Sequence, residues 1–214
     1  MTQPSDPAPG TRWSGRRAEK ETRRETILQS VCSVLARSRL SSLTMQEIAD
    51  ELGITKGNLY YYFRDKQDIL YQAHMRSMET SLRALRAAQE SKGSCAARLR
   101  QLLIDHIEGI LRDGLGNVLL TDLESLHPEQ RSHYIAKRDE FERGVRALID
   151  EGLARGEFHY PDTKLASLAM LGSINWISKW YRPEGPMTAD AVAAGMADFL
   201  MNALACPPGA RAER

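Results

Sequence analysis

One stretch of the chain decides the fold, TMQEIADELGITKGNLYYYF at residues 44–63. Thr44 precedes Glu47 by three residues, the spacing of a capping box that satisfies free amides at a helix start. Gly53 stands where the chain must turn through a left-handed residue, a conformation that glycine adopts without steric cost. Thr55 can cap a second helix. The stretch therefore predicts two short helices joined by a tight turn.

The apolar positions of this stretch have the spacing of a helix-turn-helix. Ala49 is small enough for a second helix to cross closely, and Ile54 and Leu59 can pack back against the first helix. In this motif the second helix enters the major groove of DNA. The alternative is a plain helical hairpin whose tyrosines belong to a core. The motif predicts DNA contacts at Thr44, Thr55, Lys56, Gly57, Asn58, Tyr60, Tyr61, Tyr62 and Lys66.

The chemistry of these side chains suits DNA. Lys56 can donate to guanine or to a phosphate, and Asn58 can pair with adenine or bind the backbone. The tyrosines offer hydroxyls to phosphates and ring faces to thymine methyl groups or sugars. Thr44 and Lys66 each begin a helix, where free amides and the positive end of the helix dipole favour a phosphate.

Helical periodicity dominates the rest of the chain. We therefore expect an all-α protein of about nine helices, in which a three-helix DNA-binding head precedes a larger helical domain for ligand binding and dimerisation. The first helix is expected from about Ala18 to Ser38, and a short one from Asn117 to Leu126. The expected parts are a disordered basic arm at residues 1–17, the head at 18–64, the larger domain at 65–206 and a disordered tail at 207–214.

Charge is distributed unevenly, although the formal net charge is only +1. Residues 1–66 hold eleven Lys and Arg against eight Asp and Glu, a net of +3, whereas residues 67–214 hold eighteen against twenty, a net of −2. A basic arm that leads into a near-neutral body suits a protein that meets a polyanion at one end, although a solvated charged tail has the same composition.

Other classes of protein are disfavoured. No stretch approaches the roughly 20 apolar residues that span a bilayer, and residues 1–10 lack the apolar run of a signal peptide. We therefore expect a cytoplasmic protein with no membrane partner. The three cysteines are far apart and the five histidines form no metal-binding motif, so we expect no cofactor and no metal.

The segments LTMQEIA at 43–49 and LGITKGNLYYYFRDKQDIL at 52–70 resemble the DNA-binding domain of TetR-family regulators. The resemblance covers about residues 20–72, and the rest is similar in architecture. It implies a homodimer that binds a palindromic operator, usually represses, and releases DNA when a small molecule binds the larger domain. It also implies that Asn58 occupies a position often held by Thr or Ser. The DNA contacts implied by the family pattern are Thr44, Lys56, Tyr60, Tyr61 and Lys66.

The last two expected helices, from Pro161 to about Tyr181 and from Thr188 to about Leu204, are apolar on more than one face. Such helices need partners on both sides. A four-helix interface across a two-fold axis would supply them, and burial of both helices within one subunit is the alternative. The expected interface residues are Leu168, Leu171, Ile174, Val192, Met196 and Phe199.

The segments LGSINW at 171–176 and WYRPEG at 180–185 resemble the C-terminal domain of TetR-family members that sense fatty acyl or related coenzyme A thioesters. The resemblance implies an apolar cleft with cations at its mouth for the phosphates. The candidate lining residues are Leu103, Ile107, Leu123, Tyr134, Phe141 and Trp176. The candidate cations are Arg112, Lys137 and Arg138.

Two alternatives remain open at this point. A regulator of drug efflux would bind cationic or aromatic compounds, and would need carboxylates such as Glu108, Asp122 or Glu124 at an apolar pocket. An all-helical enzyme would need an acid–base pair, for which His106 with Asp105 and His133 with Asp139 are the candidates. Neither of these pairs faces itself on a helix, and no arrangement of nucleophile, base and orienting group is visible.

Overall fold

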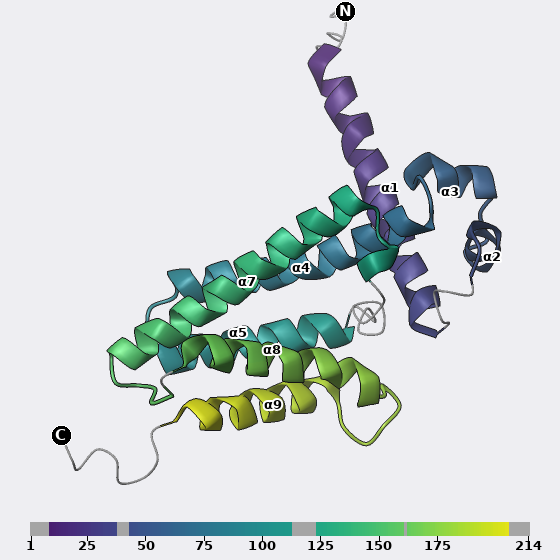
Figure 1. The fold of residues 1–214 in the computed structure, drawn as a ribbon. Coiled ribbons are helices and arrows are strands. Elements are labelled where there is room, and N and C mark those ends of the chain that lie inside the picture. The colour runs from purple at the N-terminus through teal and green to yellow at the C-terminus, as the bar shows by residue number, and fades with distance from the viewer. Residues whose placement is uncertain (1–8, 38–42, 113–122, 161, 206–214) are drawn as a thin grey trace, which may run out of the picture.

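The structure is a computed structural model, and it describes residues 9–37, 43–112, 123–160 and 162–205. All regular elements within these ranges are helical, which confirms the all-α expectation. Eight α-helices and one 3-10 turn fall in the described residues, and Figure 1 shows their arrangement. They are α1 (Pro9–Arg37), α2 (Met45–Glu51), α3 (Lys56–Tyr62), α4 (Lys66–Glu90), α5 (Cys95–Arg112), η2 (Leu123–Ser125), α7 (Pro128–Ala154), α8 (Thr163–Trp180) and α9 (Ala189–Leu204).

The N-terminal head consists of α1, α2 and α3 and ends in the first turns of α4 (Figure 1). Apolar side chains from all four helices share one buried cluster, which also takes in Leu126 from the segment before α7. Because Ile69, Leu70 and Ala73 belong to this cluster, the core of the head extends beyond the boundary expected at residue 64. The start of α4 is therefore rigidly joined to the two short helices.

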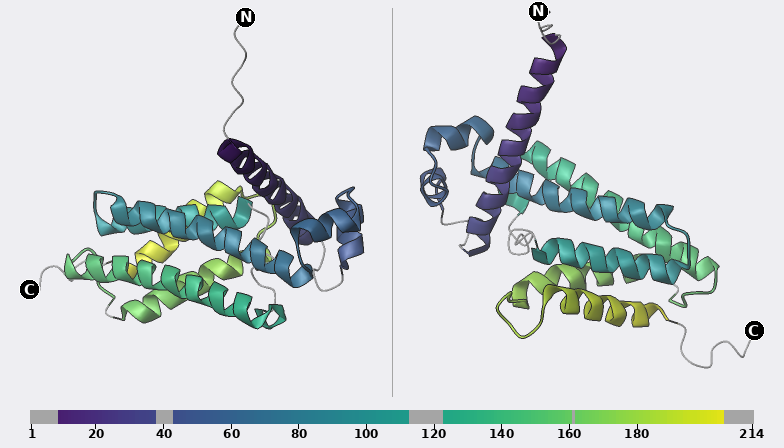
Figure 2. Two further views of the ribbon diagram at one scale, coloured as in Figure 1. Left: turned by 90° about the horizontal axis from the view of Figure 1, so that it is seen from above. Right: turned by 180° about the vertical axis from the view of Figure 1, so that it is seen from behind.

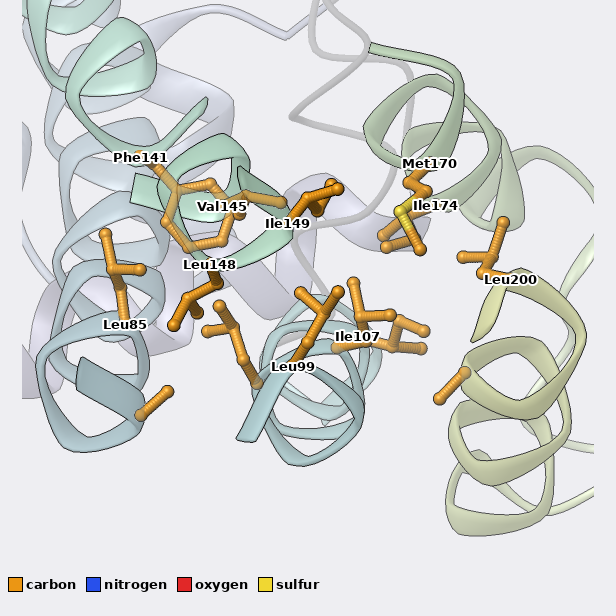
Figure 3. Close-up of a cluster of buried hydrophobic side chains, with 14 of the residues drawn as sticks. Leu85, Leu99, Ile107, Phe141, Val145, Leu148, Ile149, Met170, Ile174 and Leu200 are labelled. Carbon is orange, nitrogen blue, oxygen red and sulfur yellow. The ribbon is translucent and has the colours of Figure 1, made fainter. Parts of the chain in front are cut away.

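The body contains the rest of α4 together with α5, α7, α8 and α9. Helix α5 is central, since it packs against each of the other four. Figure 3 shows Leu85 of α4, Ile107 of α5, Phe141 of α7 and Ile174 of α8 meeting in the core. Gly144 lets α7 approach α4 closely, because a Cβ atom there would clash with the side chain of Leu85. The apolar core, at helical spacing on every helix, holds the body together.

Helix α1 begins at Pro9, well before the expected start at Ala18. Residues 9–17 are therefore helical, and the expectation that they form a disordered arm is wrong. Residues 18–24, mostly Ala, Glu, Lys and Arg, have high helix propensity and extend the helix that packing holds in place from Ile27 onward. Pro9 is favoured at a first helical position, whereas Gly10 and Gly15 lower the helix propensity of the segment between. The remainder of the expected arm, residues 1–8, and the expected tail lie outside the described residues.

The short helix expected from Asn117 to Leu126 is described only from Leu123 onward, where the chain forms the 3-10 turn η2. His127 then has an extended backbone, as the residue before a proline prefers, and Pro128 begins α7. Across the described ranges, no helix combines the length and the apolar character needed to cross a membrane.

Candidate DNA-binding surface and effector domain

The two short helices of the head are capped as their sequence predicts. The amide of Glu47 donates to the Thr44 hydroxyl at 3.2 Å, and the amide of Thr44 donates to the Glu47 carboxylate at 2.7 Å. The backbone and side-chain hydrogen bonds with Thr44 lower the pKa of Glu47. The Thr55 hydroxyl accepts from the amide of Asn58 at 3.1 Å and caps α3. Both threonines thus fix the ends of helices α2 and α3.

The turn between α2 and α3 depends on Gly53, whose φ of 63° lies in the left-handed region. The amide of Ile54 donates to the carbonyl of Ala49 at 3.0 Å and closes the turn. Ala49 and Leu59 are fully buried where the two helices cross. Helix α3 therefore packs on α2 through its inner side, and most of its outer side is exposed and open to a partner.

The outer side of α3 carries most of the predicted DNA contacts. Thr55, Lys56, Gly57 and Asn58 are exposed, as is Thr44 at the start of α2. Among the described side chains of the head, Tyr60 and Tyr61 are large exposed aromatic residues, and Tyr61 is 62% exposed. The alternative prediction, a plain helical hairpin whose tyrosines are buried in a core, is therefore wrong for Tyr60 and Tyr61.

Two of the predicted contacts are less accessible. Tyr62 is half-buried, and its ring meets that of Tyr61 edge-on with the ring centroids 4.9 Å apart. Lys66 is also half-buried, and its ammonium group donates to the carbonyl of Leu43 at 3.0 Å. This bond ties the start of α4 to the segment before α2.

A residue that the motif does not include joins this surface. The ammonium group of Lys20 lies 4.3 Å from the centroid of the Tyr61 ring, within the range of a cation–π interaction. Lys56 lies 6.0 Å from the centroid of Tyr60. The sequence contained no signal for the first contact, because Lys20 and Tyr61 are far apart in the chain.

A row of hydrogen bonds connects the head-proximal end of α4 to the start of α7, and we call it the polar ladder. Its three rungs recur every third residue on both segments. They join His127 Nε2 to the Asp65 carboxylate at 3.0 Å, the Gln130 amide to Asp68 at 3.1 Å, and the Tyr71 hydroxyl to His133 Nδ1 at 2.6 Å. Burial raises the pKa of Asp65, but the hydrogen bonds from the amide of Asp68 and from His127 together lower it by more than burial raises it. The net shift of the pKa is therefore downward.

Most of the predicted effector-pocket residues lie together in the core of the body. Leu103, Ile107, Tyr134 and Phe141 are all buried there, and Leu123 packs against the cores of both the body and the head. Trp176 does not join them. It is 61% exposed on the outer side of α8, so the expectation that it lines an internal cleft is wrong for the single chain. Ile174 and Ile177 occupy the inner side of the same helix.

Two buried histidines accompany these residues, His106, which the sequence offered only as an acid–base candidate, and His74, which the sequence analysis did not single out. His106 Nδ1 lies 2.8 Å from the Ser81 hydroxyl, and its ring packs against Phe141. The ring of His74 packs against Tyr134, with the centroids 4.8 Å apart. Burial lowers the pKa of both histidines to about 4, so they are neutral at pH 7. The core therefore offers polar groups of neutral charge among apolar side chains.

The cations expected at the mouth of a cleft have different surroundings. Arg112 bonds to Asp190 at 2.8 Å and to Glu108 at 3.2 Å, and Lys137 pairs with Glu140. Arg138 is exposed. Arg112 also borders a polar groove of about 750 Å³ between α1, α4 and α5, whose charged lining makes it unlike an apolar cleft.

The carboxylates proposed for a regulator of drug efflux and the histidines proposed for an enzyme have other partners in the structure. Glu108 pairs with Arg112 and Glu124 with Arg131, so neither is directed at an apolar pocket without a partner. Asp122 lies outside the described residues. His106 contacts Ser81 and His133 contacts Tyr71 in place of the aspartates considered as acid–base partners.

Helices α8 and α9 present an exposed apolar face. We define this face by Leu165, Leu168, Trp176, Trp180 and Phe199, all of them large and exposed. Leu168 and Phe199 were expected at an interface, and Leu171 and Met196 are half-buried beside them. Ile174 and Val192 are buried in the core of their own subunit, so their expected place in the interface is wrong. Helical periodicity showed two apolar faces but could not tell which one turns inward.

Comparison with known proteins agrees with this architecture at both ends of the chain. The profile of bacterial regulatory proteins of the tetR family matches residues 32–73, and the tetracyclin repressor-like C-terminal domain matches residues 92–204. The chain belongs to the TetR family. Members of this family are DNA-binding transcriptional regulators, which places the helix-turn-helix in its usual setting.

Relatives and solved structures extend the similarity along most of the chain. The HTH-type transcriptional repressor KstR2 of Mycobacterium tuberculosis strain H37Rv is 27% identical over 175 residues, which cover 80% of this chain and 87% of KstR2. The TetR-family regulator PfmR from Thermus thermophilus is 30% identical with a TM-score of 0.77, over 82% of this chain and 97% of PfmR. AibR, solved with isovaleryl coenzyme A and operator DNA, has the same fold with a TM-score of 0.70 at 23% identity, over 84% and 98% of the two chains.

Proposed function

We propose that this TetR-family member is a homodimeric repressor that binds a palindromic operator and is released by a small effector. The observation that carries the proposal is the outer side of α3. Lys56, Asn58, Tyr60 and Tyr61 stand exposed on a helix whose inner side is locked to α2. Two copies of such a helix read two half-sites about 34–36 Å apart on one side of the duplex.

The dimer is formed, in this proposal, by the exposed face of α8 and α9. Isolated apolar residues are common on surfaces, but several large apolar side chains exposed on one side of a helix, as Leu165, Trp176 and Trp180 are on α8, are typical of an interaction site. The small residues Ala169, Gly172 and Gly195 are exposed on the same helices and allow two backbones to approach. A second copy related by a two-fold axis covers the face with an identical one.

The effector is proposed to be an acyl coenzyme A thioester whose acyl group enters the core of the body. The neutral imidazoles of His74 and His106 and the hydroxyl of Tyr134 provide hydrogen-bonding groups for a carbonyl, and their apolar neighbours suit an acyl chain. AibR, which shares the fold, is known with isovaleryl coenzyme A. A cationic drug is less well supported, because Glu108 and Glu124 are already paired with arginines.

The polar ladder provides the route by which the effector acts on the head. Its rungs hold α7 to the first turns of α4, and these turns belong to the head's core. Leu126, just before α7, is itself buried in that core. A displacement of α7 by an effector therefore moves α4, and with it α3.

DNA binding is tested with the double variant Lys56→Ala/Tyr60→Ala. A duplex selected from a random pool by the wild-type protein serves as the operator in a gel-shift assay. Since a good contact contributes about 1–3 kcal/mol, the double variant should lose operator affinity by about 100-fold or more. The matched control is Lys92→Ala/Tyr160→Ala, which removes the same residue types from exposed positions in the α4–α5 and α7–α8 connections. Equal loss in both variants, or none in either, contradicts the role of α3.

The effector class is tested by adding acyl coenzyme A thioesters of increasing chain length to the protein–operator complex. Free coenzyme A, the free acids and a cationic dye are the comparison ligands. Release by a thioester alone supports the proposal. Release by the dye alone, or by none of these ligands while operator binding is intact, shows that the effector class is wrong and leaves the DNA-binding function standing.

A further inference from the structure

Helix α1 is far longer than the head requires. It has 29 residues, which corresponds to a length of about 43 Å. Among the side chains that the structure describes in α1, Ile27 is the first to be buried. The preceding part, residues 9–26, projects past α3 in the views of Figures 1 and 2. A helix that continues so far beyond its own core has a surface available for a partner.

The projecting part carries a strong excess of positive charge. Residues 9–26 contain six basic residues and three acidic ones, Glu19, Glu21 and Glu25, so their net charge is 6 − 3 = +3. At about 100° of rotation per residue, the six basic positions fall within an arc of about 140°, and the three acidic positions fall outside it. We call these positions the basic stripe: Arg12, Arg16, Arg17, Lys20, Arg23 and Arg24.

The direction of the basic stripe follows from the helical register. Ile27, Val31 and Val34, which are buried against the head, fall within the same arc. The stripe therefore continues the packing face of α1 beyond the point where the head ends. The described side chains agree with this register, because Lys20 lies over the ring of Tyr61 and Arg24 over that of Phe63, 5.6 Å from its centroid.

We propose that the basic stripe binds the phosphate backbone of the DNA beside the half-site that α3 contacts. The inference rests on the proposed DNA-binding function. Tyr61 on the outer side of α3 and Lys20 on the stripe are in contact, so a duplex held by α3 also faces the stripe. From Lys20 to Pro9 the helix covers about 16 Å. Duplex DNA carries about one negative charge per 1.7 Å of its axis, so this length spans several phosphates.

Phosphates, and not bases, are the inferred target because the stripe consists of six cations and lacks the amide groups of α3, with Trp13 as the one aromatic position of residues 9–26 that falls within the same arc. Among the ion pairs that the structure describes, none involves Lys20 or Arg23, and both side chains are exposed. Their charges are therefore available to replace counterions on the DNA, which makes a sequence-independent contribution to affinity.

The test compares two stripe variants with the wild-type full-length protein. One is Lys20→Ala/Arg23→Ala, and the other lacks residues 1–17. Fluorescence anisotropy over a series of salt concentrations measures binding to the selected operator and to a 30-base-pair duplex of mixed sequence. Because each phosphate contact contributes about 0.9 to the slope of log K against log salt, loss of two cations from each of two subunits should lower the slope by up to about 3.6. Affinity for both duplexes should fall by the same factor, about tenfold.

The control variant Arg86→Ala/Lys92→Ala removes two exposed cations, one from the last two turns of α4 and one from the α4–α5 connection, and should leave the slope unchanged. Figure 1 shows these segments at the end of the body away from the head. Several results would overturn the inference: stripe variants with wild-type slopes, a control variant that shifts the slope as much as they do, or a loss of affinity confined to the operator. In each of these three results the wild-type protein still binds DNA, so the proposed function is not contradicted. A wild-type protein that ignores both duplexes at low salt instead contradicts the proposed function itself.

Discussion

Tyr61 on α3 and Trp176 on α8 are almost equally exposed, at 62% and 61%, yet they belong to surfaces of different chemistry. Tyr61 contacts Lys20 and stands one turn from Asn58 on α3, whereas Trp176 stands one turn from Gly172 and one turn from Trp180 on α8. An aromatic ring among cations and amides suits a polyanion, and one among apolar side chains suits a second apolar face. The exposed fraction of a side chain marks a partner surface, but its neighbours tell which partner.

The largest expected difference between the two surfaces is their response to salt. If six or more phosphates are contacted, operator affinity should fall by about 1,000-fold between 50 and 200 mM salt. The dimer dissociation constant should change by less than about threefold, because the α8–α9 face is apolar and burial of apolar area is insensitive to screening. Anisotropy and analytical ultracentrifugation measure the two constants. A dimer whose dissociation constant rises with salt as steeply as that of the DNA complex would contradict the assignment of an apolar interface to the α8–α9 face.

Charges placed on the α8–α9 face should produce the next largest effect. Leu168→Glu/Phe199→Glu buries two carboxylates against their copies in the dimer, so the protein should become monomeric at micromolar concentration. Operator affinity should then fall by about 100-fold, since the second head no longer binds as a linked partner. The control Ala87→Glu/Ala97→Glu adds the same charges at exposed positions on α4 and α5 and should stay dimeric. A monomeric variant with unchanged operator affinity would contradict the two-headed arrangement.

Acid should weaken the body and leave the head's fold unaffected. His74 and His106 have folded pKa values of about 4, below the unfolded value near 6.5. Because the unfolded chain binds protons first, the stability that each neutral histidine confers is complete above pH 6.5 and is lost as the pH falls toward 4. The loss is about 2 kcal/mol for each histidine at pH 5.

Urea denaturation of the full-length protein at pH 7 and pH 5 measures this loss as a change in the free energy of unfolding. The variant His106→Gln should show about half of the pH dependence, whereas His159→Gln, at an exposed position, should show all of it. Equal urea midpoints at the two pH values for the wild-type protein would show that the two imidazoles are solvated.

The smallest expected effect concerns the polar ladder. His127→Ala removes the rung to Asp65, a partly exposed pair that contributes about 0.5–1 kcal/mol. Operator affinity without effector should stay within about twofold, but the factor by which the effector weakens binding should fall about two- to fivefold. His159→Ala is the matched control. Equal coupling in the two variants would place the route between body and head elsewhere.

Local chemistry determined the head from sequence alone. Capping by Thr44 and Thr55 and the turn at Gly53 depend on residues a few positions apart, so their geometry follows from spacing. The exposure of Tyr60 and Tyr61 followed from the same spacing, because Leu59 defines the buried side of α3. The operator and the effector class stay predictions of the resemblance, and the cytoplasmic setting stays a prediction from the distribution of apolar residues.

Only the tertiary structure decided which apolar face of α8 turns inward, and it placed Trp176 outside and Ile174 inside. It also brought together partners distant in the chain, such as Lys20 with Tyr61 and Asp65 with His127. Helical periodicity constrains a residue's direction about its own axis but carries no information about which neighbouring helix lies in that direction. Those choices depend on how all the apolar faces of the chain are buried at once.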